Sequence, residues 1–142
     1  MSVIPRVAAL AVGSLIAERS VTVTRDSLVR YAGASGDFNP IHYRDDIARE
    51  VGLPGVLAHG MLTMGLAAQP VIDWLGDPGR VSDYQVRFTR PIVVPPDAGV
   101  TVAISAQVAE LDADAHTARI DLTVTVAGER VLGKAQLRVI LD

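Results

Sequence analysis

One long apolar segment, from Met61 to Leu75, limits the folds open to this chain more than any other feature. Its apolar side chains leave almost no polar face, so we expect a helix that is surrounded by protein on most sides. Pro70 has no backbone N–H, which predicts a kink or a second helical piece at that point. The segment is shorter than the ~20 residues that span a bilayer and contains Gln69 and Asp73, so it is interpreted as a core helix and not as a membrane span.

From Arg80 onward, apolar and polar residues alternate with a period of two, which is typical of strands with one buried face. Turn-forming stretches rich in Pro, Gly and Asp separate these runs. The pattern predicts four long antiparallel strands, at about 84–88, 100–111, 116–126 and 131–141. A curved sheet wrapped around the apolar helix would bury both elements. The chain is therefore interpreted as one α+β domain over residues 1–142, with its motifs at 31–75 and a strand meander at 80–141.

The segment before the apolar helix is expected to hold two shorter helices. A β-rich stretch ends at Thr24, whose side chain can cap a helix over 25–32, and Gly33 and Gly36 are expected to end that helix. A second helix is expected over 46–51, before a turn that contains Gly and Pro. The loop between these two helices carries the first group of chemically useful residues.

Composition narrows the classes of function. The chain has no cysteine, which excludes disulfides, thiolate nucleophiles and Cys-bound metal centres and favours a cytoplasmic protein. A net charge of -3 gives no support for nucleic-acid binding. Residues 1–11 are apolar but lack the order of a signal peptide, so they are interpreted as a strand or arm of the folded protein. The positive mean hydropathy indicates that a partner subunit covers some apolar surface.

A candidate acid/base pair lies on the loop between the two short helices. Asp37 and His42 are five positions apart, and Pro40 between them fixes its own φ and keeps Asn39 out of the helical region. Histidine, with an unperturbed pKa of ~6.5, gives and takes protons near neutral pH, and Asp37 can orient the imidazole or hold a water beside it. The alternative is structural, because a loop aspartate often caps a turn and a loop histidine is often only a hydrogen-bonding residue.

A candidate oxyanion donor lies where the apolar helix begins. Backbone N–H groups in the first turn of a helix have no intrahelical partner and the helix dipole is positive there, so the Gly60 N–H suits a developing oxyanion. His59 and Asn39 are grouped with it as oxyanion or substrate-binding candidates. In the alternative, Gly60 only relieves packing where the loop enters the helix. A metal site made of Asp37, His42 and His59 is not supported by ligand spacing, and we expect none.

An acid/base pair and an oxyanion donor in an apolar cavity suit proton chemistry next to a thioester or ketone carbonyl. The carbonyl is polarised toward an enolate while His42 and Asp37 handle water at the β-carbon. The motifs of other enzyme classes are absent from the sequence. It has no Gly-x-Ser-x-Gly elbow of serine hydrolases, no phosphate-binding glycine loop and no His-Glu-x-x-His zinc pair. No cofactor is expected, because the thioester itself supplies the acidity.

The two motifs together resemble those of a known family. The stretch 31–42, with Asp-x-Asn-Pro-x-His, and the stretch 58–63, with His-Gly-Met, are similar to the MaoC-like motif of (R)-specific enoyl-thioester hydratases and (3R)-hydroxyacyl-thioester dehydratases. The resemblance covers the chain from about Val21 to its end. The stretch 52–79 looks especially like the catalytic HadB-type subunits of long-chain fatty-acid dehydratases.

The resemblance implies a hot-dog fold, in which the sheet wraps the central helix, and a dimer whose two sheets join edge to edge. It also implies that Asp37 and His42 form the catalytic dyad, that the Gly60 N–H is the oxyanion donor and that Asn39 orders the loop. The chain departs from the family pattern at Arg44, which follows the dyad where an acid or a small polar residue is common. A second departure is Ala68, near a position where some hydratases carry serine.

The predicted function is (R)-specific hydration and dehydration of 2-enoyl and (3R)-hydroxyacyl thioesters, by a hydro-lyase of fatty-acid metabolism. The alternatives share the fold: a non-catalytic partner subunit, which would be expected to lack the Asp/His pair, or a hot-dog acyl thioesterase, against which the Asn-Pro-Ile-His loop argues. The residues leave open acyl length, direction, pathway, CoA against acyl-carrier protein, and a homodimer against a heterodimer. An acidic carrier protein would need a local positive patch, for which Arg44, Arg87 and Arg90 are candidates.

Overall fold

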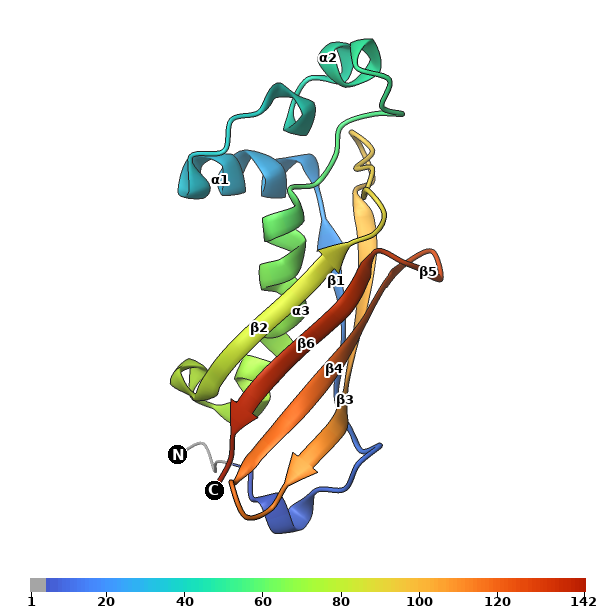
Figure 1. Ribbon diagram of the computed structural model, residues 1–142. Coiled ribbons are helices and arrows are strands. Elements are labelled where there is room, and N and C mark those ends of the chain that lie inside the picture. The colour runs from blue at the N-terminus through green and yellow to red at the C-terminus, as the bar shows by residue number, and fades with distance from the viewer. Residues whose placement is uncertain (1–4) are drawn as a thin grey trace.

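A six-stranded antiparallel sheet packs against one long helix, α3 (Gly60–Leu75), in the computed structural model, which describes residues 5–142 (Figure 1). The spatial order of the strands is β1-β3-β4-β6-β2, and the short β5 pairs with β4. A single sheet around one long helix is the hot-dog arrangement, which confirms the predicted α+β fold. The strands are β1 (Leu15–Val23), β2 (Val81–Phe88), β3 (Val100–Asp112), β4 (Thr117–Val126), β5 (Glu129–Arg130) and β6 (Leu132–Ile140).

The four predicted strands are present as β2, β3, β4 and β6. In β3, β4 and β6 buried residues alternate with more exposed ones, whereas β2 has only half-buried and exposed residues. β1 is longer than the stretch that the sequence indicated. It is an edge strand, paired only with β3, and three consecutive exposed residues, Glu18, Arg19 and Ser20, interrupt its alternation. An edge strand with this pattern gives no period-two signal, which explains why its first half was not predicted.

Helix α1 (Arg25–Ser35) begins as predicted and ends later. Thr24 caps it reciprocally: its side chain accepts a hydrogen bond from the Ser27 N–H, and the Ser27 hydroxyl accepts one from the Thr24 N–H. Of the two glycines expected to end it, Gly33 is wrong, because the helix passes through it, and Gly36 is confirmed as the C-cap. Only Gly36 adopts a left-handed φ, of 76°, which is the conformation that ends a helix most easily at glycine.

Helix α3 differs from the prediction in two respects. It runs without interruption through Pro70, so the expected second helical piece is wrong. It is also less enclosed than expected: the sheet covers one face of α3, while residues 61, 65, 69 and 73, spaced four apart along the helix, form an exposed stripe. Met61 at the start of this stripe is 59% exposed. No helix within residues 5–142 has the length and apolar character needed to cross a membrane.

The hydrophobic core lies between α3 and the inner face of the sheet. Leu75 and Val71 from the helix are fully buried, as are Ile120 and Leu137 from the central strands. From the middle of the edge strand β2, the Tyr84 hydroxyl donates a hydrogen bond of 2.7 Å to the Met64 carbonyl, which fixes the helix to the sheet edge. The first turns of α3 are therefore held in place against the sheet.

Three short helices gather at one end of the sheet, and the described ends of the chain lie at the other end, together with the 3₁₀ helices η1 (Val7–Ala9) and η3 (Pro78–Arg80) (Figure 1). The first of these ends holds α1, the 3₁₀ helix η2 (Pro40–His42) and α2 (Asp45–Glu50). Arg25 joins them, since it donates to the Val94 carbonyl at 2.6 Å and to both carboxylate oxygens of Asp45. These hydrogen bonds lower the pKa of the Asp45 carboxyl and hold the loop between α1 and α2.

The N-terminal residues 1–11 were expected to form a strand or an arm of the folded protein. Residues 1–4 lie outside the described part of the chain, and Val7–Ala9 form a 3₁₀ helix (η1), so a strand there is wrong for the described residues. The Val7 N–H donates to the Asp142 carbonyl at 3.0 Å, which fixes this segment beside the C-terminus.

Candidate active site

The loop that carries Asp37 is ordered by a chain of local hydrogen bonds. The Asp37 N–H donates to the Ser35 hydroxyl at 3.1 Å, and the Asn39 N–H donates to Asp37 Oδ1 at 3.1 Å. Asn39 Oδ1 then accepts from the Ile41 N–H at 3.3 Å. Each side chain thus caps the next turn, which is the turn-forming role typical of aspartate and asparagine. One oxygen of Asp37 is used in the loop, while the other remains free.

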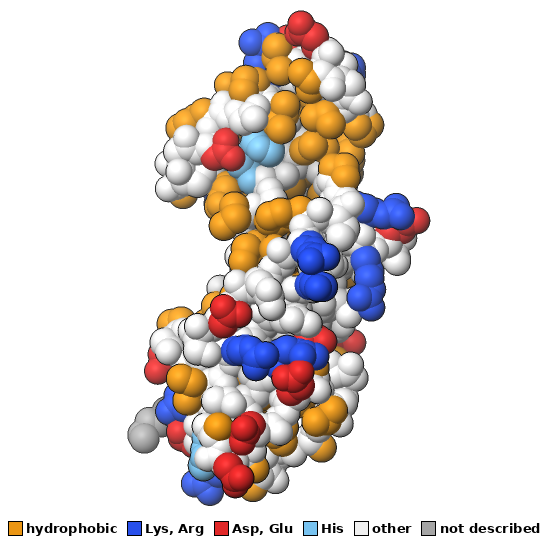
Figure 2. Space-filling view, viewed as in Figure 1, with side chains coloured by type: hydrophobic (Ala, Val, Ile, Leu, Met, Phe, Trp, Pro, Cys, Tyr) orange, Lys and Arg blue, Asp and Glu red, His pale blue; other side chains and the backbone are white. Residues whose placement is uncertain are grey.

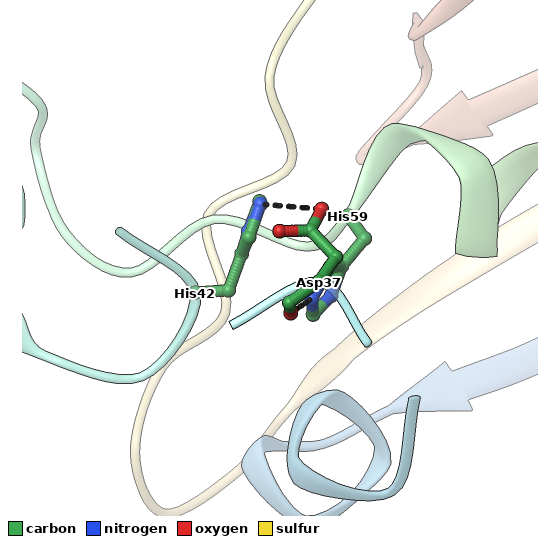
Figure 3. A group of neighbouring side chains, drawn as sticks. All are labelled: Asp37, His42 and His59. Carbon is green, nitrogen blue, oxygen red and sulfur yellow. Dashed lines mark hydrogen bonds and ion pairs between the residues drawn. The ribbon is translucent and has the colours of Figure 1, made fainter. Parts of the chain in front are cut away.

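His42 is buried and its ring is oriented by a backbone carbonyl. Nδ1 lies 2.7 Å from the Leu57 oxygen, and because a carbonyl only accepts, Nδ1 carries the proton in the neutral ring. Nε2 is then an unprotonated acceptor, 3.9 Å from Asp37 Oδ2 (Figure 3). That distance is too long for a direct hydrogen bond but allows one water or hydroxyl to contact both atoms. The pair is thus arranged as a general base beside a carboxylate.

His59 lies behind the pair and does not face the cavity. Its side chain is 1% exposed, and its ring stacks on His42 with centroids 3.8 Å apart, while the edge of Tyr31 packs against it at 4.8 Å. Nε2 donates to the Asp37 carbonyl at 3.1 Å, and Nδ1 has no hydrogen-bond partner in the described part of the chain. Burial lowers the pKa of His59, so the ring is held in its neutral form.

An apolar cavity of about 330 Å³ opens between the start of α3 and the end of β2. His42 and Gly60 line it, together with Phe88 from β2 and Leu132 from β6. Asp37 is not part of this lining, although its carboxylate is half-exposed and turned toward His42. His42 of the first motif and Gly60 of the second therefore line one cavity, and Asp37 lies beside it.

Gly60 fits both of the roles considered for it. A Cβ at this position would lie 3.0 Å from Cε1 of the Phe88 ring, which is tighter than nine in ten real Cβ contacts, so the ring would have to shift and packing favours glycine. Gly60 is also the first residue of α3, and its N–H has no hydrogen-bond acceptor within residues 5–142. The positive end of a 16-residue helix thus presents a free donor where the cavity meets His42.

The geometry of Asp37, His42 and His59 does not suit a metal ion. One candidate ligand atom from each lies within 4.8 Å of the others. However, each ring uses one nitrogen on a backbone carbonyl, and the remaining nitrogen of His59 is fully buried. Only His42 Nε2 and the Asp37 carboxylate are left facing a common accessible point, which is too few protein ligands for a typical zinc site.

Three contributors to the site were not identified from the sequence. They are the Leu57 carbonyl that orients His42, the Tyr31 ring beside His59, and the Phe88 ring against Gly60. Tyr31 begins the first motif and Phe88 lies in a predicted strand. The sequence therefore drew attention to both residues but gave no sign that their rings contact His59 and Gly60. A backbone carbonyl carries no sequence signal, because every residue has one.

Comparisons with known proteins show which family this chain resembles. Residues 9–127 match the family model described as the MaoC like domain. The 3-hydroxyacyl-thioester dehydratase X of Mycobacterium tuberculosis is 38% identical over 81 residues, which is 57% of this chain and 28% of that protein. The (R)-specific enoyl-CoA hydratase of Rhodospirillum rubrum is 30% identical over 120 residues, covering 83% of this chain and 81% of that protein.

A solved structure of a MaoC-like dehydratase superposes on 98% of this chain with a TM-score of 0.94 and 37% sequence identity. The match covers only 43% of that structure's chain. The present chain therefore spans less than half the length of this structure and of the M. tuberculosis relative, but most of the length of the R. rubrum hydratase.

Proposed function

This chain belongs to the MaoC-like domain family, and from that premise we propose that it catalyses (R)-specific hydration of 2-enoyl thioesters and the reverse dehydration of (3R)-hydroxyacyl thioesters. The observation that carries the proposal is the position of His42 Nε2, 3.9 Å from the Asp37 carboxylate and beside the same cavity as the Gly60 N–H. Such a hydro-lyase acts in fatty-acid metabolism. We propose that residues 1–142 belong to one MaoC-like domain that carries this activity.

The proposed reaction uses each group at a stated atom. The thioester carbonyl oxygen accepts a hydrogen bond from the Gly60 N–H, which stabilises negative charge as an enolate forms. A water held between His42 Nε2 and Asp37 Oδ2 loses a proton to the pair while its oxygen bonds to the β-carbon. The pair then returns a proton to the α-carbon. In dehydration the same pair removes the α-proton and protonates the leaving hydroxyl.

The function can be tested by adding crotonyl-CoA to the purified chain and following the loss of enoyl absorbance. Formation of the (R)-3-hydroxy product, identified by chiral chromatography, is the expected result. Release of free thiol without hydration would instead indicate a thioesterase. Hydration that appears only after a related hot-dog subunit is added would indicate that the chain needs a heterologous partner.

We further propose that the chain works as a dimer with a second copy or a related subunit. The exposed stripe of α3 at residues 61, 65, 69 and 73 begins with the apolar side chain of Met61, next to Gly60 at the cavity. Its Gln69 and Asp73 are bonded to each other, and Asp73 also pairs with Arg19. Phe38 and Val29 are also more than half exposed and contribute apolar surface at the end of the molecule that holds the site. Light scattering of the purified chain, alone and with a candidate partner subunit, measures which assembly forms.

His59 is proposed to position the dyad. Phenylalanine at this site would keep the stacked ring but lose the hydrogen bond to the Asp37 carbonyl, so His59→Phe should lower kcat by about tenfold, with KM little changed. His59→Gln, which retains a side-chain N–H, should recover part of that loss. Unchanged kcat in the phenylalanine variant would show that the hydrogen bond has no role in turnover.

The same substitution predicts a change in stability with pH. Because the folded pKa of His59 is lower than its unfolded value near 6.5, the unfolded chain binds more protons as the pH falls. The free energy of unfolding should therefore decrease below about pH 6.5 in the original chain. That decrease should be smaller in His59→Phe, which denaturant titrations at pH 7.5 and 5.0 can measure.

A further inference from the structure

The end of the molecule that holds His42 is joined to the rest through a narrower waist, and histidine side chains are visible on it among apolar ones (Figure 2). Helices α1 and α2 and the 3₁₀ helix η2 make up most of this end. Both α-helices lie beyond the end of the sheet and not on its face (Figure 1). The direction of the His42 ring relative to the cavity therefore depends on how this end is attached.

A short backbone layer forms one part of this attachment. His42 Nδ1 bonds to the Leu57 carbonyl at 2.7 Å, and Leu57 lies in the middle of the segment 56–58. This segment pairs in antiparallel fashion with residues 92–94 through two N–H···O bonds of 2.9 Å, with Leu57 opposite Val93. The carbonyl that orients His42 is therefore only as fixed as the segment 92–94 beside it.

Arg25 is bonded to both sides of this arrangement. Its Nε donates to the Val94 carbonyl at 2.6 Å, at the end of the segment that pairs with Leu57. Its two terminal nitrogens donate to the two carboxylate oxygens of Asp45, at 3.0 and 2.9 Å. Asp45 begins α2 and follows shortly after His42 in the chain. The contacts thus form a closed circuit that begins and ends at His42.

A guanidinium group suits this position because all of its N–H donors lie in one plane. Two of the donors bind the Asp45 carboxylate in a bidentate manner, which fixes the plane, and a third is left for the carbonyl. The Arg25 side chain is 22% exposed, so salt screens this ion pair less than it screens a fully exposed one. Lysine would keep the charge, but its flexible chain would not fix the two partners in one plane.

We propose that Arg25 is a positioning residue for the hydration reaction and acts on His42 through the segment that contains Leu57. This inference rests on the proposed function. Arg25 does not line the cavity, and no hydrogen bond within residues 5–142 joins it directly to His42. Its effect is on the direction of Nε2. A shift of the Leu57 carbonyl would turn the imidazole away from Asp37, and a small misplacement of a reacting group lowers kcat strongly.

Arg25→Lys should lower kcat for crotonyl-CoA hydration by about tenfold, with KM little changed. The matched control is Arg80→Lys, at the opposite end of the molecule. Arg80 is 21% exposed, and it too bonds to a carboxylate, of Asp142 at 2.8 Å, and to a backbone carbonyl, of Ile140 at 3.4 Å. Thermal unfolding should show a loss of stability in both variants, whereas activity should fall only in Arg25→Lys. Equal kcat values for the two folded variants would overturn the proposal.

A spectroscopic measurement separates the positioning role from the reaction. In the ¹⁵N-labelled original chain, at a pH where histidine is neutral, the His42 resonances should show the proton on Nδ1, as the bond to the Leu57 carbonyl requires. Arg25→Lys and a second variant, Asp45→Asn, should move these resonances toward a mixture of tautomers, and Arg80→Lys should not.

If the original chain fails to hydrate crotonyl-CoA but the resonances change in this way, Arg25 does position His42 and the assigned reaction is wrong. If the His42 resonances are unchanged in the folded Arg25→Lys and Asp45→Asn variants, the bonds of Arg25 serve only the stability of the fold, and the proposal is wrong whatever the activity.

Discussion

Replacing Asp37 with asparagine is expected to lower kcat for crotonyl-CoA hydration by about 10³-fold without unfolding the protein. Asp37 Oδ1 accepts the Asn39 N–H, and an asparagine oxygen can accept the same bond, so the turn is kept. Oδ2, which faces His42 Nε2, would become an amide nitrogen that neither takes a proton nor carries charge. The half-exposed side chain contributes little to packing, so the loss falls on the chemistry.

The measurement is the initial rate of enoyl absorbance loss, with thermal unfolding recorded to show that the fold is intact. Asp114→Asn, in the exposed turn between β3 and β4, is the matched control because it removes one carboxylate at the far end of the molecule. His42→Ala should cause a loss of similar size, and combining it with Asp37→Asn should add little, since the two groups act as a unit. Near-normal turnover in a folded Asp37→Asn variant would reject the dyad.

The fold was largely predictable from the sequence, because an apolar helix and a set of alternating strands can each bury their apolar residues only against the other. The apolar segment at 61–75 needed cover, and the alternation in β3, β4 and β6 supplied a sheet with one apolar face. The predictions that were wrong concern features that the local sequence pattern does not determine, such as the exact end of a helix and the face that becomes buried. The end of α1 was expected at Gly33 and Gly36 together, but only Gly36 ends the helix, because only there does the chain turn left-handed. The expected enclosure of α3 on most sides is wrong for the described residues, because composition does not tell which face of an apolar helix the sheet will cover.

The sequence named the residues of the candidate site but did not give the directions in which their side chains point. The motifs named Asp37, His42 and Gly60, and tertiary folding brings all three to one place. His59 was grouped with the substrate-binding candidates because it precedes Gly60 in the sequence. Its backbone is extended at that point, and its side chain lies under His42 instead of lining the cavity. Such a direction depends on long-range packing, which no local motif encodes.

The two roles of Gly60 can be separated by substitutions that differ only in the N–H group. Alanine at position 60 keeps the backbone donor, whereas proline removes it. Proline is tolerated at the first position of a helix, and the preceding His59 has φ -62° and ψ 130°, the extended conformation that a following proline requires. Either new side chain would meet the Phe88 ring, so both substitutions belong in a Phe88→Ala background.

In that background, Gly60→Ala is expected to keep kcat within a few-fold of Phe88→Ala alone, while Gly60→Pro should lower it by about 10²–10³-fold. The reason is that an oxyanion forming on the thioester would lose its donor at the positive end of α3, while the steric change is nearly matched. Initial rates with crotonyl-CoA, together with circular dichroism of each variant, provide the measurement. Equal kcat values for the folded alanine and proline variants would mean that Gly60 is there for packing against Phe88, and that the enolate is stabilised by another group.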